Sequence, residues 1–271
     1  MRAILKYPGA KNRIADWIVS YMPKHDVYLE LFGGSMAVLL NKGRSHIETV
    51  NDIDVEIVNF FLVLRDHPEE LKRSIELTPF ARDEYKNAFE ETEDPVERAR
   101  RYCVKCWQGF GNSQLYMNGF KSGQQSHSPN PAKAWAGLPE IIPQIAKRLK
   151  GVQIENLPAN ELIKRYNTQD VFVYADPPYL PGIRKGYLYK HEMTEKGHVG
   201  LLERLLQHPG PVMISGYDND LYNSYLQGWR KAEKETRAEA GHKRTEVLWM
   251  NYQTPQVTLL NYVKEDGEIK W

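Results

Sequence analysis

Three short, mostly apolar segments are each followed at once by a turn of polar or glycine residues. Apolar runs bounded by turn-forming residues are typical of strands buried inside a sheet. The segments are Val27–Leu31, His46–Val50 and Val171–Ala175, and they precede Phe32–Ser35, Asn51–Asp52 and Asp176–Tyr179, respectively. A helical pattern follows each of the first two turns. The chain is therefore predicted to fold as an α/β protein with ligand-facing turns at the carboxyl ends of its strands.

This alternation of strands and helices is interrupted in the middle of the chain. Residues 66–150 show no strand pattern: 66–97 are acidic with helical spacing, 109–137 are irregular with a possible hairpin, and 135–149 are again helical. The other predicted elements are helices over 13–22, 37–41, 53–64, 160–166 and 199–207, and strands over 152–155, 212–215, 246–252 and 257–262. We therefore predict an open sheet formed by residues 1–65 and 151–271, with an insertion at 66–150.

Composition restricts the class of protein further. The 271 residues are 41% hydrophobic and 26% charged, which is typical of a globular chain and excludes disordered, collagen-like and coiled-coil proteins. No apolar run approaches the roughly 18 residues that span a bilayer, and the first residues lack the apolar core of a signal peptide. Two cysteines, Cys103 and Cys106, cannot form a disulfide scaffold. We expect a soluble, cytoplasmic protein without a membrane partner.

Charge is distributed unevenly, although the net charge is only +1. Residues 98–150 contain nine lysines and arginines and one acid, so this block carries +8 and the rest of the chain −7. The block also contains six aromatic residues, and basic residues interleaved with aromatics suit the phosphates and bases of a nucleic acid. The alternative is a solvated helix face beside a small core. The aromatic residues are Tyr102, Trp107, Phe110, Tyr116, Phe120 and Trp135.

The first two turns are suited to a nucleoside. Gly33 and Gly34 allow the backbone to approach a ligand, although the turn has neither the dinucleotide-binding nor the phosphate-loop pattern. Asp52, which ends the second strand, is placed to bind the two hydroxyls of a ribose. The alternatives are an ordinary turn and a helix N-cap formed by Asp52 or Asp54.

The turn Asp176-Pro177-Pro178-Tyr179 is the strongest chemical signal in the sequence. Two prolines restrict the backbone, and they hold a carboxylate and an aromatic ring at the end of a very apolar strand. An ordinary tight turn does not require this combination. The motif therefore indicates a binding or catalytic site at the carboxyl edge of the sheet.

Together with four other stretches, this motif resembles the D12 class of DNA adenine-N6 methyltransferases, which includes the bacterial and phage Dam enzymes. The stretches are Lys6–Lys11, Tyr28–Ser35, Val50–Asp54, Tyr174–Tyr179 and Thr245–Tyr252. The variable region lies between the glycine turn and the Asp-Pro-Pro-Tyr motif, as in the α group of amino methyltransferases. The resemblance brackets nearly the whole chain.

The resemblance implies a Rossmann-like, seven-stranded methyltransferase sheet with an inserted, mainly helical target-recognition domain at 66–150. It implies methyl transfer from S-adenosyl-L-methionine to the N6 of a flipped adenine in double-stranded DNA, without a metal. The catalytic motif falls on Asp176, Pro177, Pro178 and Tyr179, and the cofactor contacts fall on Tyr7, Lys11, Phe32, Gly33, Asp52 and Asp176. The DNA-binding candidates are Arg100, Arg101, Lys105, Lys121, Arg184 and Lys185.

The sequence departs from the family pattern in three places. Tyr7–Ala10 replaces the frequent Trp-Ala-Gly-Gly, Asn156–Pro158 replaces a frequent acid, and residues 107–135 lack the GATC-reading hairpin sequence of Dam. Three alternative functions remain open: an N4-cytosine methyltransferase, a silent DNA-binding relative, and a methyltransferase acting on small molecules or proteins.

The spacing of Cys103 and Cys106 fits only half a zinc site. Because no endonuclease motif is present, a restriction role requires a separate nuclease chain.

Overall fold

The computed structural model describes residues 1–112, 114, 116–123, 127, 129–181, 190–237 and 243–253. Within them the strands form one seven-stranded sheet in the order β3-β2-β1-β4-β5-β7-β6, as the family resemblance implies. The first five strands are parallel, and β7 runs antiparallel to both of its neighbours. The strands are β1 (Val27–Glu30), β2 (Ile47–Asn51), β3 (Val152–Glu155), β4 (Val171–Ala175), β5 (Val212–Tyr217), β6 (Arg230–Arg237) and β7 (Lys243–Met250).

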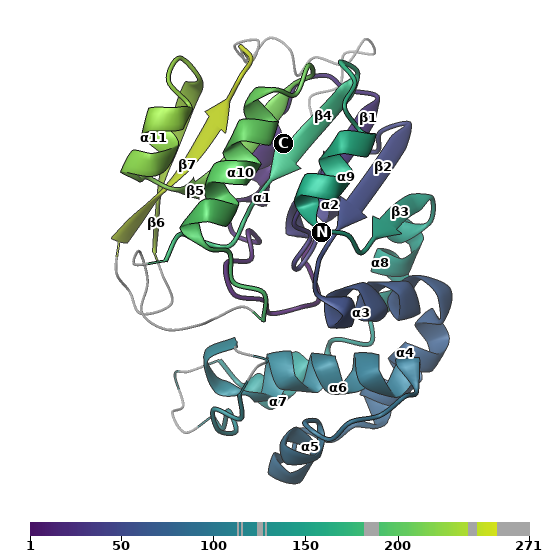
Figure 1. Cartoon of the computed structure of the whole chain (residues 1–271). Helices are drawn as coiled ribbons and strands as arrows, with labels where there is room; N and C mark the ends of the chain where they lie inside the picture. The colour runs from purple at the N-terminus through teal and green to yellow at the C-terminus, as the bar shows by residue number, and fades with distance from the viewer. Residues whose placement is uncertain are drawn as a thin grey trace, which may run out of the picture.

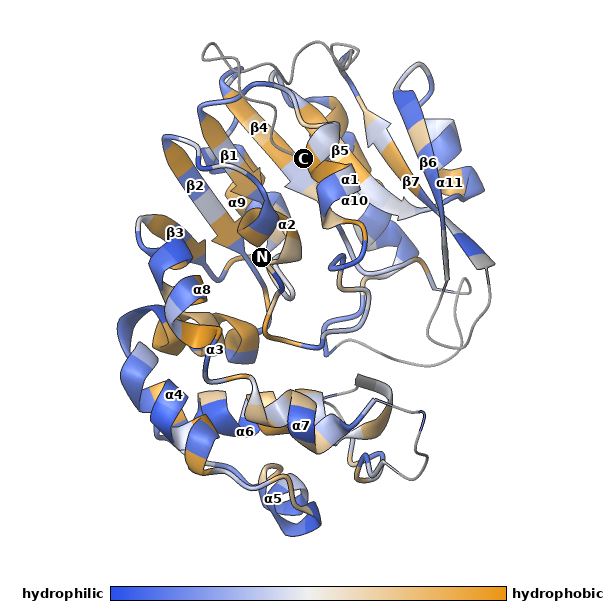
Figure 2. Ribbon diagram, turned by 180° about the vertical axis from the view of Figure 1, so that it is seen from behind, coloured by the Kyte–Doolittle hydropathy of each residue, from blue (hydrophilic) through white to orange (hydrophobic). Residues whose placement is uncertain are grey.

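Both faces of the sheet are covered by helices. Side chains alternate along β1, so that Tyr28 belongs to one hydrophobic cluster and Leu29 to the other. Figure 1 shows α9, α10 and α11 on one face, and Figure 2 shows α1 and α2 on the other, over strands coloured as apolar. These helices are α1 (Ala15–Ser20), α2 (Ala37–Asn41), α9 (Ala159–Arg165), α10 (Glu195–Leu206) and α11 (Asp220–Tyr225).

The connection from β2 to its parallel neighbour β3 consists of the remaining helices. They lie beyond the carboxyl ends of the parallel strands in Figure 1. Their hydrophobic residues belong to the same cluster as one face of the sheet, so the two parts share a core. The helices are α3 (Val55–Asp66), α4 (Pro68–Leu77), α5 (Arg82–Asn87), α6 (Pro95–Gln108), η1 (Phe110–Asn112), α7 (Pro131–Ala136) and α8 (Ile142–Leu149).

Capping residues and indole hydrogen bonds fix the longest of these helices, α6. Asp94 accepts hydrogen bonds from the amides of Val96 and Glu97, and Pro95 occupies the first turn, where its missing N–H costs no hydrogen bond. The Trp107 indole donates to the carbonyl of Ile4 at 2.8 Å, which ties α6 to the amino-terminal segment. The helical unit is thereby held against the part of the chain that precedes β1.

Several predicted elements differ from the structure. The helix predicted over 135–149 is interrupted between α7 and α8, near Gly137 and Pro139. Strand β6 pairs with β7 and extends the sheet at its edge, whereas α11 had no clear sequence signal. The strand predicted over 257–262 lies outside the described residues. None of the described helices has the length and apolarity needed to cross a membrane.

Candidate active site

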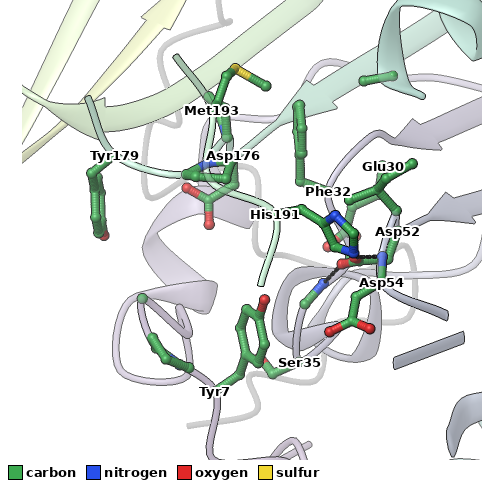
Figure 3. Close-up of a pocket in the computed structure, with 18 of the residues that line it drawn as sticks. Tyr7, Glu30, Phe32, Ser35, Asp52, Asp54, Asp176, Tyr179, His191 and Met193 are labelled. Carbon is green, nitrogen blue, oxygen red and sulfur yellow. Dashed lines mark hydrogen bonds between the residues drawn. The ribbon is translucent and has the colours of Figure 1, made fainter. Parts of the chain in front are cut away.

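A cavity of about 370 Å³ opens at the carboxyl ends of β1, β2 and β4. The strand order reverses between β1 and β4, and open α/β sheets bind ligands at such a point. All the residues that the sequence analysis assigned to catalysis or cofactor binding line this cavity (Figure 3). These residues are Tyr7, Lys11, Phe32, Gly33, Asp52, Asp176, Pro177, Pro178 and Tyr179.

The glycine turn after β1 packs closely against the end of β2. The Gly33 amide donates to the carbonyl of Asn51 at 2.7 Å, and a Cβ atom at Gly33 would lie 2.9 Å from a methyl group of Val50. Gly34 has a φ of 48°, and Met36 also has a positive φ of 55°, which is uncommon for a residue with a side chain. The close approach requires the glycines and brings this turn beside Asp52.

Asp52 is held by two backbone amides. Gly34 donates to one carboxylate oxygen at 2.8 Å and Asp54 to the other at 2.9 Å (Figure 3). Burial raises the pKa of Asp52 to about 6, although both hydrogen bonds act to lower it. The N-cap of α3 is Asp54, which accepts from the amide of Glu56. Asp52 therefore lines the cavity and does not cap the helix.

Asn156 occupies one of the positions where the sequence departs from the family pattern. Its side-chain amide donates to the carbonyl of Asp52 at 2.7 Å, and Pro158 lines the cavity. The segment before α9 is thus attached to the end of β2. It helps to position Asp52 through the backbone rather than through a carboxylate of its own.

Lys11 and Asp176 form the centre of the polar cluster. The Lys11 ammonium lies 2.9 Å from Asp176 Oδ1, and Ser215 donates to the same oxygen at 2.8 Å. Tyr174 contacts the Ser215 hydroxyl at 2.8 Å. Burial acts to lower the pKa of Lys11, but the combined attraction of Asp176, Tyr179, Glu246 and Tyr174 outweighs it and raises that pKa well above its usual value. Lys11 is therefore a permanent cation beside the motif carboxylate.

Tyr179 is fixed on two sides. Its hydroxyl accepts a hydrogen bond from Lys11 at 2.9 Å and donates to Glu246 Oε1 at 3.2 Å. Its ring stacks on that of Tyr217, with centroids 4.2 Å apart and an interplanar angle of 16°. Sequence reasoning assigned no role to Glu246 or Tyr217. An acid directly before the apolar run Val247–Met250 was the available signal for Glu246.

Glu30 is a second site residue for which the sequence analysis gave no role. It ends β1, lines the cavity and is almost completely buried. Its Oε2 accepts hydrogen bonds from the Tyr28 hydroxyl at 2.7 Å and from the Leu39 amide at 3.1 Å. Burial raises the pKa of Glu30 to about 8 despite these bonds. The protonated form of Glu30 is therefore favoured at neutral pH.

The arginines of the basic block are largely neutralised by acids just outside it. Arg100 pairs with Glu97 at 2.6 Å and Glu84 at 2.9 Å, and Arg101 pairs with Glu97 at 2.7 Å. Within the part of the chain that the structure describes, four of the nine basic residues form such ion pairs, because α3, α5, α6 and β2 bring acids from outside the block beside them. The other pairs are Arg98 with Glu56 and Arg148 with Glu48. DNA contact by Arg100 and Arg101 stays a prediction, but both guanidinium groups already have partners.

Four further lysines have a different environment: Lys105 and Lys121 belong to the block, whereas Lys6 and Lys190 lie outside it. Of these, Lys190 lies 3.9 Å from Asp54 Oδ1. Lys6 lies over the Trp107 ring, 3.5 Å from its centroid, and its pKa is lowered to about 8 by burial and by the nearby charge of Lys121. Lys105 likewise has a pKa lowered by burial, with Lys190 adding repulsion. We call Lys6, Lys105, Lys121 and Lys190 the basic rim. Arg184 and Lys185 lie outside the described residues.

The aromatic residues of the block also divide into two groups. Tyr102, Trp107 and Trp135 are buried in the core, whereas Phe110 and Tyr116 are 50% and 59% exposed. Phe120 is partly buried and packs against Phe80. Only the exposed group is placed to contact a partner. The buried rings account for the alternative interpretation of the block as part of a helical core.

The two cysteines are buried thiols on α6. Burial raises the pKa of Cys103 well above its usual value and that of Cys106 to about 12. Thiols in this state are poor metal ligands and nucleophiles. Among the described residues, no three His, Cys, Asp or Glu side chains are grouped to hold a metal ion.

A carboxylate and a tyrosine ring held by a proline turn, beside a nucleoside-sized cavity at the switch point, are the features of an amino methyltransferase site. Residues 7–244 match the family of D12 class N6 adenine-specific DNA methyltransferases, and the chain belongs to that family. It is therefore an adenine-specific DNA methyltransferase by class. The chain is 24% identical over 241 residues to the DNA adenine methylase of Salmonella typhi, covering 83% of this chain and 84% of that one. Identity to the DNA adenine methylase of Escherichia coli K12 is 22% with the same coverage.

Proposed function

We propose that the protein transfers a methyl group from S-adenosyl-L-methionine to the exocyclic N6 of an adenine flipped out of double-stranded DNA. The observation that carries this proposal is the position of Asp176 and Tyr179, which line the same cavity as Asp52. One end of the cavity thus offers acceptors for ribose hydroxyls, and the other offers an acceptor and a ring for an aromatic amine.

The cavity lining fits the proposed methyl donor. Its volume of about 370 Å³ is within the usual range for ligand sites, roughly 300–1,000 Å³. The glycine turn leaves room for a nucleoside, and the carboxylates of Asp52 and Asp176 suit a ligand that bears positive charge. When bound, S-adenosylmethionine supplies an electrophilic methyl group on a positively charged sulfur. Tyr7, Lys11, Phe32, Gly33, Asp52 and Asp176 would hold it.

The motif residues then act on the amine. The N6 lone pair of adenine is delocalised into the ring, so the free amine is a weak nucleophile. Asp176 and the Pro177 carbonyl would accept hydrogen bonds from its two N–H groups, which draws the nitrogen toward tetrahedral geometry and localises the lone pair so that it can point at the methyl group. Positive charge develops on nitrogen as the methyl group arrives, and Asp176 is an acceptor already in place for that charge and the proton.

Tyr179 provides the ring on which the flipped base would stack. Stacking of a base on an aromatic side chain contributes about 1–3 kcal/mol. One face of the Tyr179 ring already contacts Tyr217, so the orientation of its plane is set before DNA binds. A prearranged ring loses little side-chain entropy when the base arrives.

We assign target recognition to residues 66–150 and phosphate binding to the basic rim. Lys6 and Lys190 directly precede the cavity residues Tyr7 and His191, while Lys105 and Lys121 belong to the helical unit. A duplex bound along these lysines would lie at the mouth of the cavity. The exposed rings of Phe110 and Tyr116 are on the same unit. A role in restriction would require a separate nuclease.

Sequencing of DNA from cells that express this chain, with detection of modified bases, tests the proposal. N6-methyladenine at a defined sequence is the expected product. N4-methylcytosine would support the alternative amino methyltransferase, since the same acceptors suit any exocyclic amine. Unmodified DNA together with cofactor-dependent methylation of another substrate would contradict the proposal.

A further inference from the structure

Glu246 places a carboxylate in a part of β7 whose next residues are apolar. Its side chain is 5% exposed, and Val247 and Leu248 beside it are fully buried. A buried carboxylate lowers stability unless its partners compensate for the lost hydration. Burial accordingly raises the pKa of Glu246. Buried ionisable groups with displaced pKa values cluster at functional sites, and the contacts of Glu246 show what it can do here.

The partners of Glu246 are incomplete. Oε1 accepts the Tyr179 hydroxyl at 3.2 Å. Oε2 is buried, has no hydrogen-bond partner among the described residues, and lies 3.6 Å from the Lys11 ammonium. A buried acceptor without a donor is rare in native proteins and calls for an explanation. Here the nearest cation is close but beyond hydrogen-bond distance.

Asp176 Oδ1 also contacts Lys11, but unlike Glu246 Oε2 it already has two donors. Asp176 Oδ1 receives both the Lys11 ammonium at 2.9 Å and the Ser215 hydroxyl at 2.8 Å. A carboxylate oxygen has about two acceptor positions. A substrate N–H that uses this oxygen must therefore displace one donor, and one that uses Oδ2 still meets a carboxylate whose negative charge is largely cancelled by Lys11. Ser215 is held by Tyr174, whereas Lys11 has a flexible side chain and a second carboxylate within reach.

We propose that Glu246 is a positioning residue that receives the Lys11 ammonium when the target amine engages Asp176. This inference rests on the proposed function. The ammonium needs to move by less than about 1 Å to reach ordinary hydrogen-bond distance from Oε2. It stays paired with a carboxylate throughout, so no isolated charge arises in the buried site.

The proposal explains why one ammonium is placed between two carboxylates. With Lys11 on Asp176, much of the negative charge of that carboxylate is cancelled. With Lys11 on Glu246, Asp176 presents its full charge to the nitrogen that becomes positive during transfer. Glu246 should therefore affect the transfer step and leave binding of cofactor and DNA nearly unchanged.

The test is the single-turnover rate of methyl transfer to duplex DNA. Glu246→Gln keeps an acceptor for Tyr179 but removes the charge that attracts Lys11. We expect a rate about 10- to 100-fold lower, as for small displacements of catalytic groups, with the Kd values for S-adenosylmethionine and DNA within a few fold of wild type. Glu246→Asp, which keeps the charge, should retain more of the rate than Glu246→Gln. Glu233→Gln, in the neighbouring strand and outside the cavity, is the matched control and should not change the rate.

A double-variant cycle separates positioning through Lys11 from a general structural effect. In a Lys11→Met background, Glu246→Gln should cause no further loss of rate, because the group it acts upon is absent. Two independent, multiplying losses would overturn the inference. So would a wild-type rate in a folded Glu246→Gln protein, while the proposed function would stand. A wild-type protein that transfers no methyl group to DNA would contradict both.

Discussion

Lys11 and Asp176 lie far apart in the sequence, and the ammonium of one is 2.9 Å from the carboxylate of the other. Lys11 precedes the first strand, whereas Asp176 follows β4. Their contact joins the amino-terminal segment to the catalytic motif. The consequences of removing either charge therefore extend beyond the residue that is changed.

Asp176→Asn should abolish most of the transfer step and leave DNA binding largely intact. The amide keeps the shape and one acceptor but lacks the negative charge that stabilises the developing cation, and loss of one such contact costs about 10²–10³ in rate. Single-turnover methyl transfer measures the loss. Transfer at the wild-type rate would rule out the mechanism proposed for the motif.

Tyr179→Ala should instead weaken retention of the flipped base. Lost stacking amounts to about 1–3 kcal/mol. A 2-aminopurine placed at the target position reports the change, because its emission depends on stacking. Tyr179→Phe is the matched control: it keeps the ring and removes the hydroxyl that contacts Lys11 and Glu246. If emission on binding is the same for wild type and Tyr179→Ala, the base does not stack on this ring.

Asp52→Ala should lower the affinity for S-adenosylmethionine. A hydrogen bond between a charged group and a hydroxyl contributes roughly 1.5–3 kcal/mol, which corresponds to a ten- to a hundredfold change in Kd. Isothermal calorimetry measures the affinity, and thermal unfolding verifies the fold. Asp66→Ala, at the exposed end of α3, is the control. An unchanged Kd would remove Asp52 from the cofactor site.

Affinity for S-adenosylmethionine should also fall as the pH is lowered through about 6. The pKa of Asp52 is raised to about 6 by burial, so below that value the carboxyl takes up a proton and no longer offers two anionic acceptors. The carboxylate of Asp52 is half protonated at about pH 6, so the affinity should be highest toward pH 7 and should fall progressively toward pH 5. Calorimetry between pH 5 and 7 covers this window, in which Glu30, with a pKa of about 8, stays protonated. Asp52→Asn should show no such dependence.

Lysines of the basic rim should determine the salt dependence of DNA binding. Lys105→Ala with Lys121→Ala should reduce the slope of log K against log salt by up to about two units if both contact phosphates. Arg100→Ala with Arg101→Ala removes the same charge from ion-paired positions and should change the slope little. Equal effects of the two pairs would mean that the internal ion pairs do not keep these arginines from DNA.

The sequence determined the elements whose cause is local. Apolar runs specified β1, β2 and β4, the turns at their ends specified the glycines, Asp52 and Asp176, and all nine predicted cavity residues are found in one cavity. The absence of a strand pattern, together with an acidic stretch followed by a basic one, marked the helical unit. Parallel strands end at the same edge, so residues that follow them meet without further information.

Only the tertiary structure decided what depends on contacts between distant segments. The charge count of residues 98–150 did not reveal that Glu84 and Glu97 neutralise Arg100, because ion pairing follows helix packing and not position in the chain. The position of β7 between β5 and β6 likewise follows from packing between distant segments. That position brings Glu246 close to Lys11 and Tyr179. A buried carboxylate is recognisable in a sequence only as an acid in an apolar run. Its partners are selected by the sheet order, which no local pattern encodes.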